Sequence, residues 1–197
     1  VLALLIRYFV GTPTVVQQES MYPNLKPGER LILNRIPRTK KQMPSRGDII
    51  TFEAPTKKVV TDKEVDFSKP VAIYSRKFNN VISKFTYYVL EWGKESYIKR
   101  VIALPGEHVQ IMDGKVYIKG EELDESAYLK DTVVTNSNNG VFTDFTVPEG
   151  CVFAMGDNRE HSIDCRKFGC IPLEKIEGKG TVRFWPLNKM GKIEKAE

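Results

Sequence analysis

The sequence predicts a mainly β protein made of antiparallel sheets. Three observations carry this prediction: short apolar runs recur along the chain, Gly and Pro turns separate them, and the dipeptide Asp113-Gly114 is a strong hairpin signal. At 197 residues, 41% of them hydrophobic, the chain can form one large domain or two small ones.

The chain opens with an apolar run at residues 1–10 that only Arg7 interrupts. A helix that spans a bilayer needs roughly 20 apolar residues, so this run is too short to cross one as it stands. We interpret residues 1–11 as the end of a truncated membrane anchor, with Arg7 and Tyr8 near the interface, followed by a domain at 12–197. An amphipathic helix packed on that domain is the alternative.

Strands are expected wherever an apolar run lies between turn signals. The turns include Lys26-Pro27-Gly28, Arg46-Gly47 and Pro105-Gly106. The predicted strands are Thr12–Val16, Arg30–Arg35, Asp48–Phe52, Tyr97–Leu104, Glu107–Met112, Lys115–Lys119, Cys151–Met155 and Thr181–Trp185.

Two segments interrupt this pattern. The insertion at residues 54–96 is too long for a plain loop, and part of it has apolar residues at helical spacing: Phe78, Val81, Ile82, Phe85, Tyr88, Val89 and Trp92. We expect this stripe to pack in the core; contact with a membrane or a substrate is the alternative. The polar, Asn-rich excursion at 121–150 reads as a hairpin or flexible segment without a chemical signal.

The charge and the cysteines exclude some functions. The net charge of +5 suits an anionic membrane surface, but solvated faces explain it as well. No RNA-binding signature, zinc-ligand spacing or phosphate-binding glycine loop occurs, so a nucleic acid partner is not expected. Three cysteines leave at least one unpaired within the chain, and a Cys165–Cys170 bridge is open but not favoured.

A candidate nucleophile lies where the first strand breaks. Ser20 follows that strand and precedes Pro23, which cannot continue a strand, while Met21 and Leu25 can form an apolar wall beside the hydroxyl. A serine hydroxyl needs a base to take its proton. The histidines are His108 and His161, and a Ser-His-Asp triad through His161 stays open on sequence grounds.

Lys99 is the other candidate base. A lysine is charged at neutral pH unless burial lowers its pKa, which desolvation can do by roughly 3–5 units. Lys99 lies in the apolar strand Tyr97–Ile102, which could supply such burial, although a lysine on a solvated strand face is the more common arrangement.

Four stretches in this order resemble the type I signal peptidases, bacterial membrane-bound serine proteases with a Ser-Lys dyad. They are Ser20-Met21-Tyr22-Pro23, Arg46–Phe52, Tyr97–Glu107 and Gly156–Arg166. The resemblance runs from about Pro13 to Pro186, with one long insertion.

The resemblance implies a role for each matching residue. Ser20 is then the nucleophile and Lys99 the general base, and Ser162 orients the lysine. Two structural ion pairs, Arg100 with Asp157 and Asp164 with Arg166, hold the last loop against the dyad. Met21, Tyr97 and Ile98 wall a pocket for the small residue before the cut, as in Ala-x-Ala cleavage sites.

Three positions depart from the family pattern. Cys165 replaces a serine, which affects no catalytic role, and Asn24 stands where threonine is more common, a mild change to which the sequence assigns no meaning. Gln18 stands where serine or glycine is usual at the oxyanion hole. Its amide could supply the second donor, or its side chain could point away.

The sequence therefore predicts a signal peptidase I that uses no metal or cofactor. Its expected partners are signal peptides of exported preproteins and the lipid around its anchor. We expect a monomer in the cell membrane, with a single-pass anchor and an extracytoplasmic catalytic domain. The alternatives are a self-cleaving regulatory protease with the same dyad and a catalytically idle assembly factor of the same fold.

Overall fold

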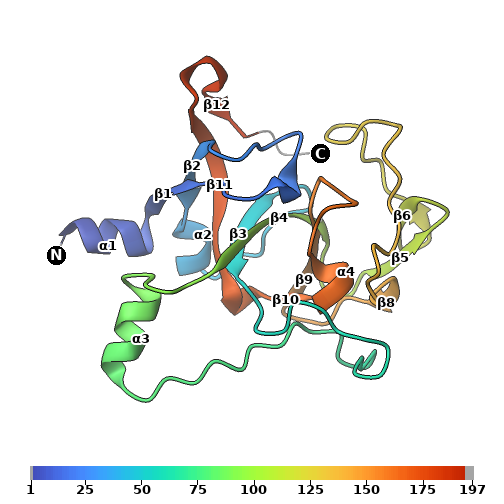
Figure 1. The fold of residues 1–197 in the computed structure, drawn as a ribbon, viewed down its shortest axis with the longest axis horizontal. Coiled ribbons are helices and arrows are strands. Elements are labelled where there is room, and N and C mark those ends of the chain that lie inside the picture. Colours follow the sequence, from blue (N-terminus) through green and yellow to red (C-terminus); the bar gives the residue numbers. More distant parts are fainter. Residues whose placement is uncertain (1, 194–197) are drawn as a thin grey trace.

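The computed structural model describes residues 2–193 as two antiparallel β-sheets with short helices at their borders (Figure 1). Residue 1 of the predicted anchor segment and residues 194–197 of the predicted domain lie outside the described residues. Every ladder between named strands is antiparallel, which confirms the predicted fold class.

The larger sheet has eight strands in the order β1-β2-β11-β3-β4-β9-β10, and β12 pairs with β11. Their bounds are β1 Gly11–Val15, β2 Arg30–Asn34, β3 Ile49–Glu53, β4 Ser96–Ala103, β9 Cys151–Met155, β10 Ile171–Pro172, β11 Ile176–Trp185 and β12 Gly191–Lys192. The predicted strands match these to within one or two residues, except that β11 begins five residues earlier.

Glycines hide the first half of β11 in the sequence. A Cβ at Gly178 would lie 3.0 Å from the carbonyl oxygen of Asn34, so the close approach of β2 favours glycine there. The register shifts beside Gly178 and Gly180 are bulges, and they interrupt the alternation by which a strand is recognised.

The smaller sheet has four strands in the order β7-β6-β5-β8, with bounds β5 His108–Met112, β6 Lys115–Ile118, β7 Glu121–Glu122 and β8 Asp144–Thr146. The predicted hairpin forms: Met112 is opposite Lys115, and both turn residues, Asp113 and Gly114, have positive φ. The main core joins the two sheets, because buried Val109 and Phe145 of the smaller one belong to the same cluster as Val101 and Phe153 of the larger.

The helices are short: α1 Leu2–Phe9, η1 Glu19–Met21, α2 Ile36–Thr39, α3 Val81–Tyr88, α4 Cys165–Phe168, η2 Leu173–Lys175 and η3 Leu187–Lys189. No helix within residues 2–193 has both the length and the apolar character needed to cross a bilayer. None of the α1 residues is buried.

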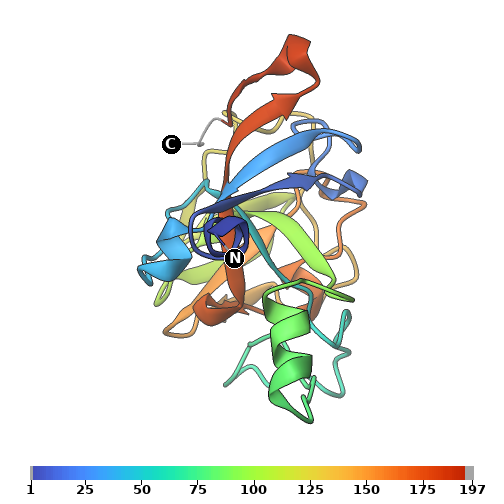
Figure 2. The same cartoon turned by 90° about the vertical axis from the view of Figure 1, so that its left-hand side faces the viewer.

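The insertion contains the expected helix, α3, but the expectation that its stripe packs in the core is wrong. Asn80 begins the helix with a capping box that it shares with Ser83. Tyr87 is the buried residue of α3, whereas Val81, Ile82 and Phe85 are exposed. The physical reason is position: the insertion carries α3 away from both sheets, so no second layer covers its apolar face (Figures 1 and 2).

Candidate active site

The structure brings Ser20 and Lys99 into direct contact. Ser20 lies in the single turn η1, and Lys99 lies in the middle of β4. The Lys99 ammonium donates a hydrogen bond to Ser20 Oγ at 2.7 Å. Both residues are buried, with 4% of Ser20 and 1% of Lys99 exposed. A hydroxyl and an amine this close can exchange a proton directly.

Local backbone bonds explain why the chain turns Ser20 inward. β1 ends at Val15, and the Val16 carbonyl accepts a hydrogen bond from the Gly28 N–H. Met21 is fully buried in a small apolar cluster with Val16 and Leu31, so η1 is anchored next to the hydroxyl.

The surroundings of Lys99 favour its neutral form. Burial lowers the pKa of Lys99 to about 8, although the negative charges of Asp164 and Asp157 act in the opposite direction. Ser20 is its hydrogen-bonding partner among the described side chains, and none of the ion pairs within residues 2–193 includes Lys99. The Tyr97 ring lies 5.4 Å from the ammonium.

The loop from Gly156 to Ser162 holds η1 from the other side. The Asn158 N–H donates to the Ser20 carbonyl at 3.1 Å, and the Asn158 amide donates to the Glu19 carbonyl at 3.2 Å. A Cβ at Gly156 would lie 2.3 Å from both the Ser20 carbonyl oxygen and Ser162 Oγ. Only glycine fits there, because any side chain would displace the nucleophile.

Three ion pairs, two buried and one partly buried, support this loop, and we call them the ion-pair frame. They are Arg100 with Asp157, Arg166 with Asp164, and Arg159 with Glu125. Each guanidinium donates two hydrogen bonds to its carboxylate, one to each oxygen. This bidentate geometry is the strongest for an Arg–carboxylate pair. The frame contains all four charged residues that the sequence assigned to structural pairs.

The Asp164 carboxylate connects the frame to the loop. Burial by itself would raise the pKa of Asp164, but hydrogen bonds from Arg166 and from the Gly156 N–H hold it below its usual range. Asp164 also caps α4 by accepting from the Arg166 N–H. A single charged side chain thus fixes the loop, the helix and one guanidinium together.

Ser162 and His161 lie on this loop in different environments. Ser162 is buried and its Oγ has no hydrogen-bond partner within residues 2–193, so it does not contact the Lys99 ammonium here. His161 is exposed, and its backbone N–H bonds to the Asn158 carbonyl. The second histidine, His108, lies in β5 beside Asp144 in the smaller sheet. The structure therefore places no imidazole on Ser20.

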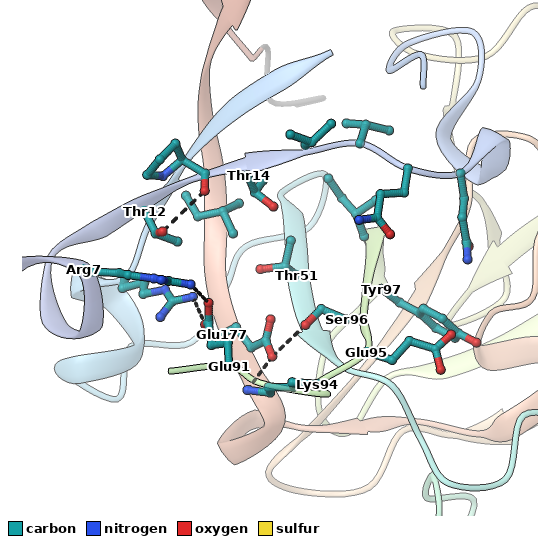
Figure 3. Close-up of a pocket in the computed structure, with 18 residues that line it drawn as sticks. Arg7, Thr12, Thr14, Thr51, Glu91, Lys94, Glu95, Ser96, Tyr97 and Glu177 are labelled. Atoms are coloured by element: carbon teal, nitrogen blue, oxygen red, sulfur yellow. Dashed lines mark hydrogen bonds and ion pairs between the residues drawn. The ribbon is translucent and has the colours of Figure 1, made fainter. Parts of the chain in front are cut away.

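A cleft of about 430 Å³ lies next to the dyad, and its lining includes sequence neighbours of Ser20 and Lys99 but neither residue itself. Thr12 and Thr14 of β1 lie on one side, Ser96 and Tyr97 of β4 on the other, and Thr51 of β3 lies between them (Figure 3). The lining continues beyond β1 to Gln18, two residues before Ser20. Along β4 it continues to Ile98, one residue before Lys99.

Both walls of this cleft present unpaired strand edges. β1 pairs with β2 and is a terminal strand of its sheet. β4 pairs with β9 only from Arg100 onward, so the other edge of its segment 96–99 has no ladder partner among the described strands. Open backbone N–H and C=O groups of this kind can bind an extended peptide as an added strand.

Two of the three predicted pocket residues line this cleft. Tyr97 and Ile98 line it, and so does Gln18, whose exposed amide makes no hydrogen bond to the described residues. Met21 does not line it. Its side chain lies in the apolar cluster with Val16, against which Ile98 packs.

Sequence reasoning missed three residues that contact the ion-pair frame. Asn24 donates to the Asp157 carboxylate and to the Tyr128 carbonyl, each at 2.8 Å. The Tyr128 ring lies 4.2 Å from the Arg100 guanidinium, and Glu125 pairs with Arg159. Tyr128 and Glu125 belong to the excursion at 121–150, where no local pattern announces such long-range contacts. Only the exchange of threonine for asparagine at position 24 gave a signal.

All three cysteines lie among the described residues, and none of them is in a disulfide. Cys151, Cys165 and Cys170 are all buried and free. Burial raises the pKa of the Cys165 thiol well above its usual value, and its sulfur accepts the Ala154 N–H at 3.2 Å. Within residues 2–193, no three His, Cys, Asp or Glu side chains gather closely enough to hold a metal ion.

Comparison with known proteins identifies a family and several similar chains. Residues 1–185 match the family described as signal peptidase, peptidase S26. A probable signal peptidase I-1 from Synechocystis is 32% identical over 98% of this chain and 81% of its own length. Signal peptidase I from Leptolyngbya laminosa is 33% identical over 98% and 78%. Signal peptidase I T from Bacillus subtilis is 32% identical over 96% and 81%.

Among solved structures, a signal peptidase I from Enterococcus faecalis is 26% identical to this chain. The alignment covers 71% of this chain and 98% of the other, with a TM-score of 0.44.

Proposed function

Because the chain belongs to the peptidase S26 family of signal peptidases, it is a peptidase that removes signal peptides, and we propose that Ser20 is its nucleophile and Lys99 its general base. The observation that carries this assignment is the 2.7 Å contact between the two side chains, made by an amine whose pKa burial lowers to about 8. Such an amine is partly neutral at physiological pH and can accept a proton.

The reaction proceeds by acyl transfer in two halves. Ser20 Oγ attacks the scissile carbonyl carbon while Lys99 Nζ takes the hydroxyl proton, and the protonated lysine then gives that proton to the leaving amine as the C–N bond breaks. In the second half, neutral Lys99 takes a proton from water, whose oxygen attacks the ester. The signal peptide leaves as a carboxylic acid, and the proton returns from Lys99 to Ser20 Oγ.

The developing oxyanion needs donors that are in place beforehand. The backbone N–H of Ser20 is the first candidate. Gln18 supplies the second in this proposal, because its amide lies in the cleft two residues before the nucleophile and is not engaged elsewhere in the described residues.

Ser162 and the ion-pair frame act as positioning groups in this account. The buried Ser162 hydroxyl is unpartnered and lies beside Gly156 and the Ser20 carbonyl, so it is available to Lys99 when Ser20 is acylated. Arg100 with Asp157, and Asp164 with Arg166, keep the loop against the dyad by the bonds described above.

The substrate lies in the cleft as an extended strand between β1 and the free edge of β4. Tyr97 and Ile98 wall the subsites next to the cut, and Met21 backs this wall from the apolar cluster. Bulky side chains close to a packed core of this kind are disfavoured, which supports a preference for small residues in an Ala-x-Ala sequence.

The remaining parts of the proposal concern location. Residues 1–11 form the end of a single-pass membrane anchor, and the catalytic domain acts as a monomer on the extracytoplasmic side. The helix α1 is largely apolar and none of its residues is buried, which supports an anchor role.

The test is cleavage of a purified preprotein with an Ala-x-Ala site, with the product N-terminus mapped by mass spectrometry. We expect one cut after the second alanine, loss of that cut when this alanine is replaced by leucine, and none with Ser20→Ala. A cut elsewhere, or equal cleavage of the leucine substrate, would contradict the proposed specificity.

A further inference from the structure

The insertion ends in an apolar surface that nothing in the described molecule covers. It consists of Val81, Ile82, Phe85, Leu90 and Trp92, which we call the α3 face; Val81 is 81% exposed, Ile82 73% and Trp92 78%. The opposite side of the helix is the packed one, where Tyr87 contacts Phe78 and Tyr88 and bonds to Glu53. Contiguous exposed apolar residues mark an interaction site more often than chance.

The charges beside the α3 face are basic. Lys77 and Lys84 are exposed, and within residues 2–193 neither of them forms an ion pair with a carboxylate. The nearby acids are already neutralised, since Glu91 pairs with Arg7 and Arg35, and Glu95 pairs with Lys58. An amphipathic helix with lysine and arginine beside an apolar face complements an anionic lipid surface.

A second exposed apolar helix, α1, is linked to the end of the insertion. Leu2, Leu5 and Ile6 of α1 are exposed, and Arg7 joins this helix to the end of the insertion through its 2.6 Å contact with Glu91. Both α1 and α3 project from the same side of the molecule, toward the viewer in Figure 2. The substrate cleft opens between them, because Arg7 and Glu91 line it.

We propose that α3 lies on an anionic membrane surface as an interfacial helix. Its apolar face enters the boundary between headgroups and acyl chains, and Lys77 and Lys84 face the lipid phosphates. The insertion thereby gives the domain a second membrane contact, next to α1, and keeps the mouth of the cleft at the depth where a membrane-bound substrate emerges. The α3 contact does not depend on the roles of Ser20 and Lys99.

The two tryptophans allow a direct test. Trp92 ends the α3 face and Trp185 ends β11, so Trp185→Phe leaves Trp92 as the sole reporter in the full chain. On adding vesicles of phosphatidylglycerol and phosphatidylcholine, its emission should shift to the blue and be quenched by lipids brominated high in the acyl chain. Unchanged Trp92 emission while the chain sediments with the vesicles would overturn the proposal.

A matched pair of variants separates α3 from α1. In the Trp185→Phe background, Ile82→Glu with Phe85→Glu should abolish the blue shift and weaken vesicle binding by about 10-fold or more, given the apolar area withdrawn. Val134→Glu, at a valine of the 121–150 excursion whose exposed fraction of 55% lies between those of Ile82 and Phe85, should behave as the parent. Cleavage of a soluble peptide should stay unchanged in both, because neither substitution lies in the cleft.

Three results would overturn the proposal. The first is equal vesicle binding by the Ile82→Glu/Phe85→Glu chain and its parent. The second is binding to phosphatidylcholine alone that matches binding to the anionic mixture. The third is a lipid-free dimer in analytical ultracentrifugation that these substitutions dissociate, since the α3 face would then be covered by a second copy of the chain.

Discussion

Lys99 and Arg100 are neighbours on β4, and both side chains are almost completely buried. They point to opposite faces of the strand, where their hydrogen-bond partners differ. Arg100 points to the ion-pair frame, where its guanidinium donates two hydrogen bonds to Asp157 and a third to the Gly47 carbonyl. Lys99 points to the dyad, where its hydrogen-bond partner is a neutral hydroxyl.

The difference shows how one strand can hold both a structural and a reactive cation. A buried guanidinium with a bidentate carboxylate is satisfied as an ion, and it costs stability mainly when one partner is removed. A buried ammonium without a directly bonded counter-ion is destabilised because it has lost its hydration. Its pKa therefore falls, and the neutral amine can act as a base. We therefore expect substitutions at the dyad to affect chemistry, and substitutions in the frame to affect folding.

The largest effect should come from the dyad itself. Ser20→Ala and Lys99→Ala should each reduce kcat on the order of 10⁴- to 10⁶-fold, and the double variant should be no worse, because residues that act as a unit are not additive. His161→Ala, in the same loop region but exposed, is the control and should retain activity. Loss of activity in His161→Ala with survival in Lys99→Ala would assign the base to histidine instead.

The frame should respond in stability. Asp164→Asn keeps the shape of the side chain but leaves the Arg166 guanidinium buried without a counter-charge. The free energy of unfolding should fall by about 3–5 kcal/mol in urea titrations. Asp144→Asn, which breaks an exposed contact with His108, should cost about 1 kcal/mol or less. Equal losses in the two variants would remove the distinction between the frame and the surface.

The oxyanion site comes next. If the Gln18 amide is the second donor, Gln18→Ala should lower kcat by roughly 10²–10³ with little change in KM, and Gln18→Ser should recover part of the loss. Steady-state kinetics on the preprotein measures this. Wild-type rates in Gln18→Ala would mean that backbone groups or another residue build the hole.

The smallest expected effect is the cost in stability of burying the lysine. Because the folded pKa of Lys99, about 8, lies below its ordinary 10.5, the unfolded chain binds more protons between these values, and stability should rise with pH. From pH 7 to pH 9 the wild type should gain about 1 kcal/mol relative to Lys99→Met. Parallel stability curves for the two proteins would contradict the lowered pKa.

The sequence was sufficient to predict most of the fold and the contact between Ser20 and Lys99. The strand that ends before Ser20 and the strand that carries Lys99 and Arg100 have short apolar runs and clear turns, so local patterning placed both to within one or two residues. The four motifs then predicted which of these residues meet.

The sequence did not predict contacts between distant segments, because no local pattern connects them. Asn24 joins Asp157 and Tyr128 across more than one hundred positions of the chain, and such pairing depends on the completed fold. The stripe of α3 illustrates the opposite problem. Helical periodicity identifies an apolar face correctly, but it does not say whether protein or another phase covers that face.

The most direct test of the account is the pH dependence of kcat/KM on a short soluble peptide, since this quantity reports the free enzyme. A base that must be neutral predicts a limb that rises with a midpoint near pH 8, the pKa to which burial lowers Lys99. Asp157→Asn should lower stability as a frame substitution, and in the protein that remains folded it should also move this midpoint to lower pH, because the Asp157 charge raises the pKa of Lys99. A flat profile, or a rising limb that disappears in His161→Ala, would contradict Lys99 as the general base.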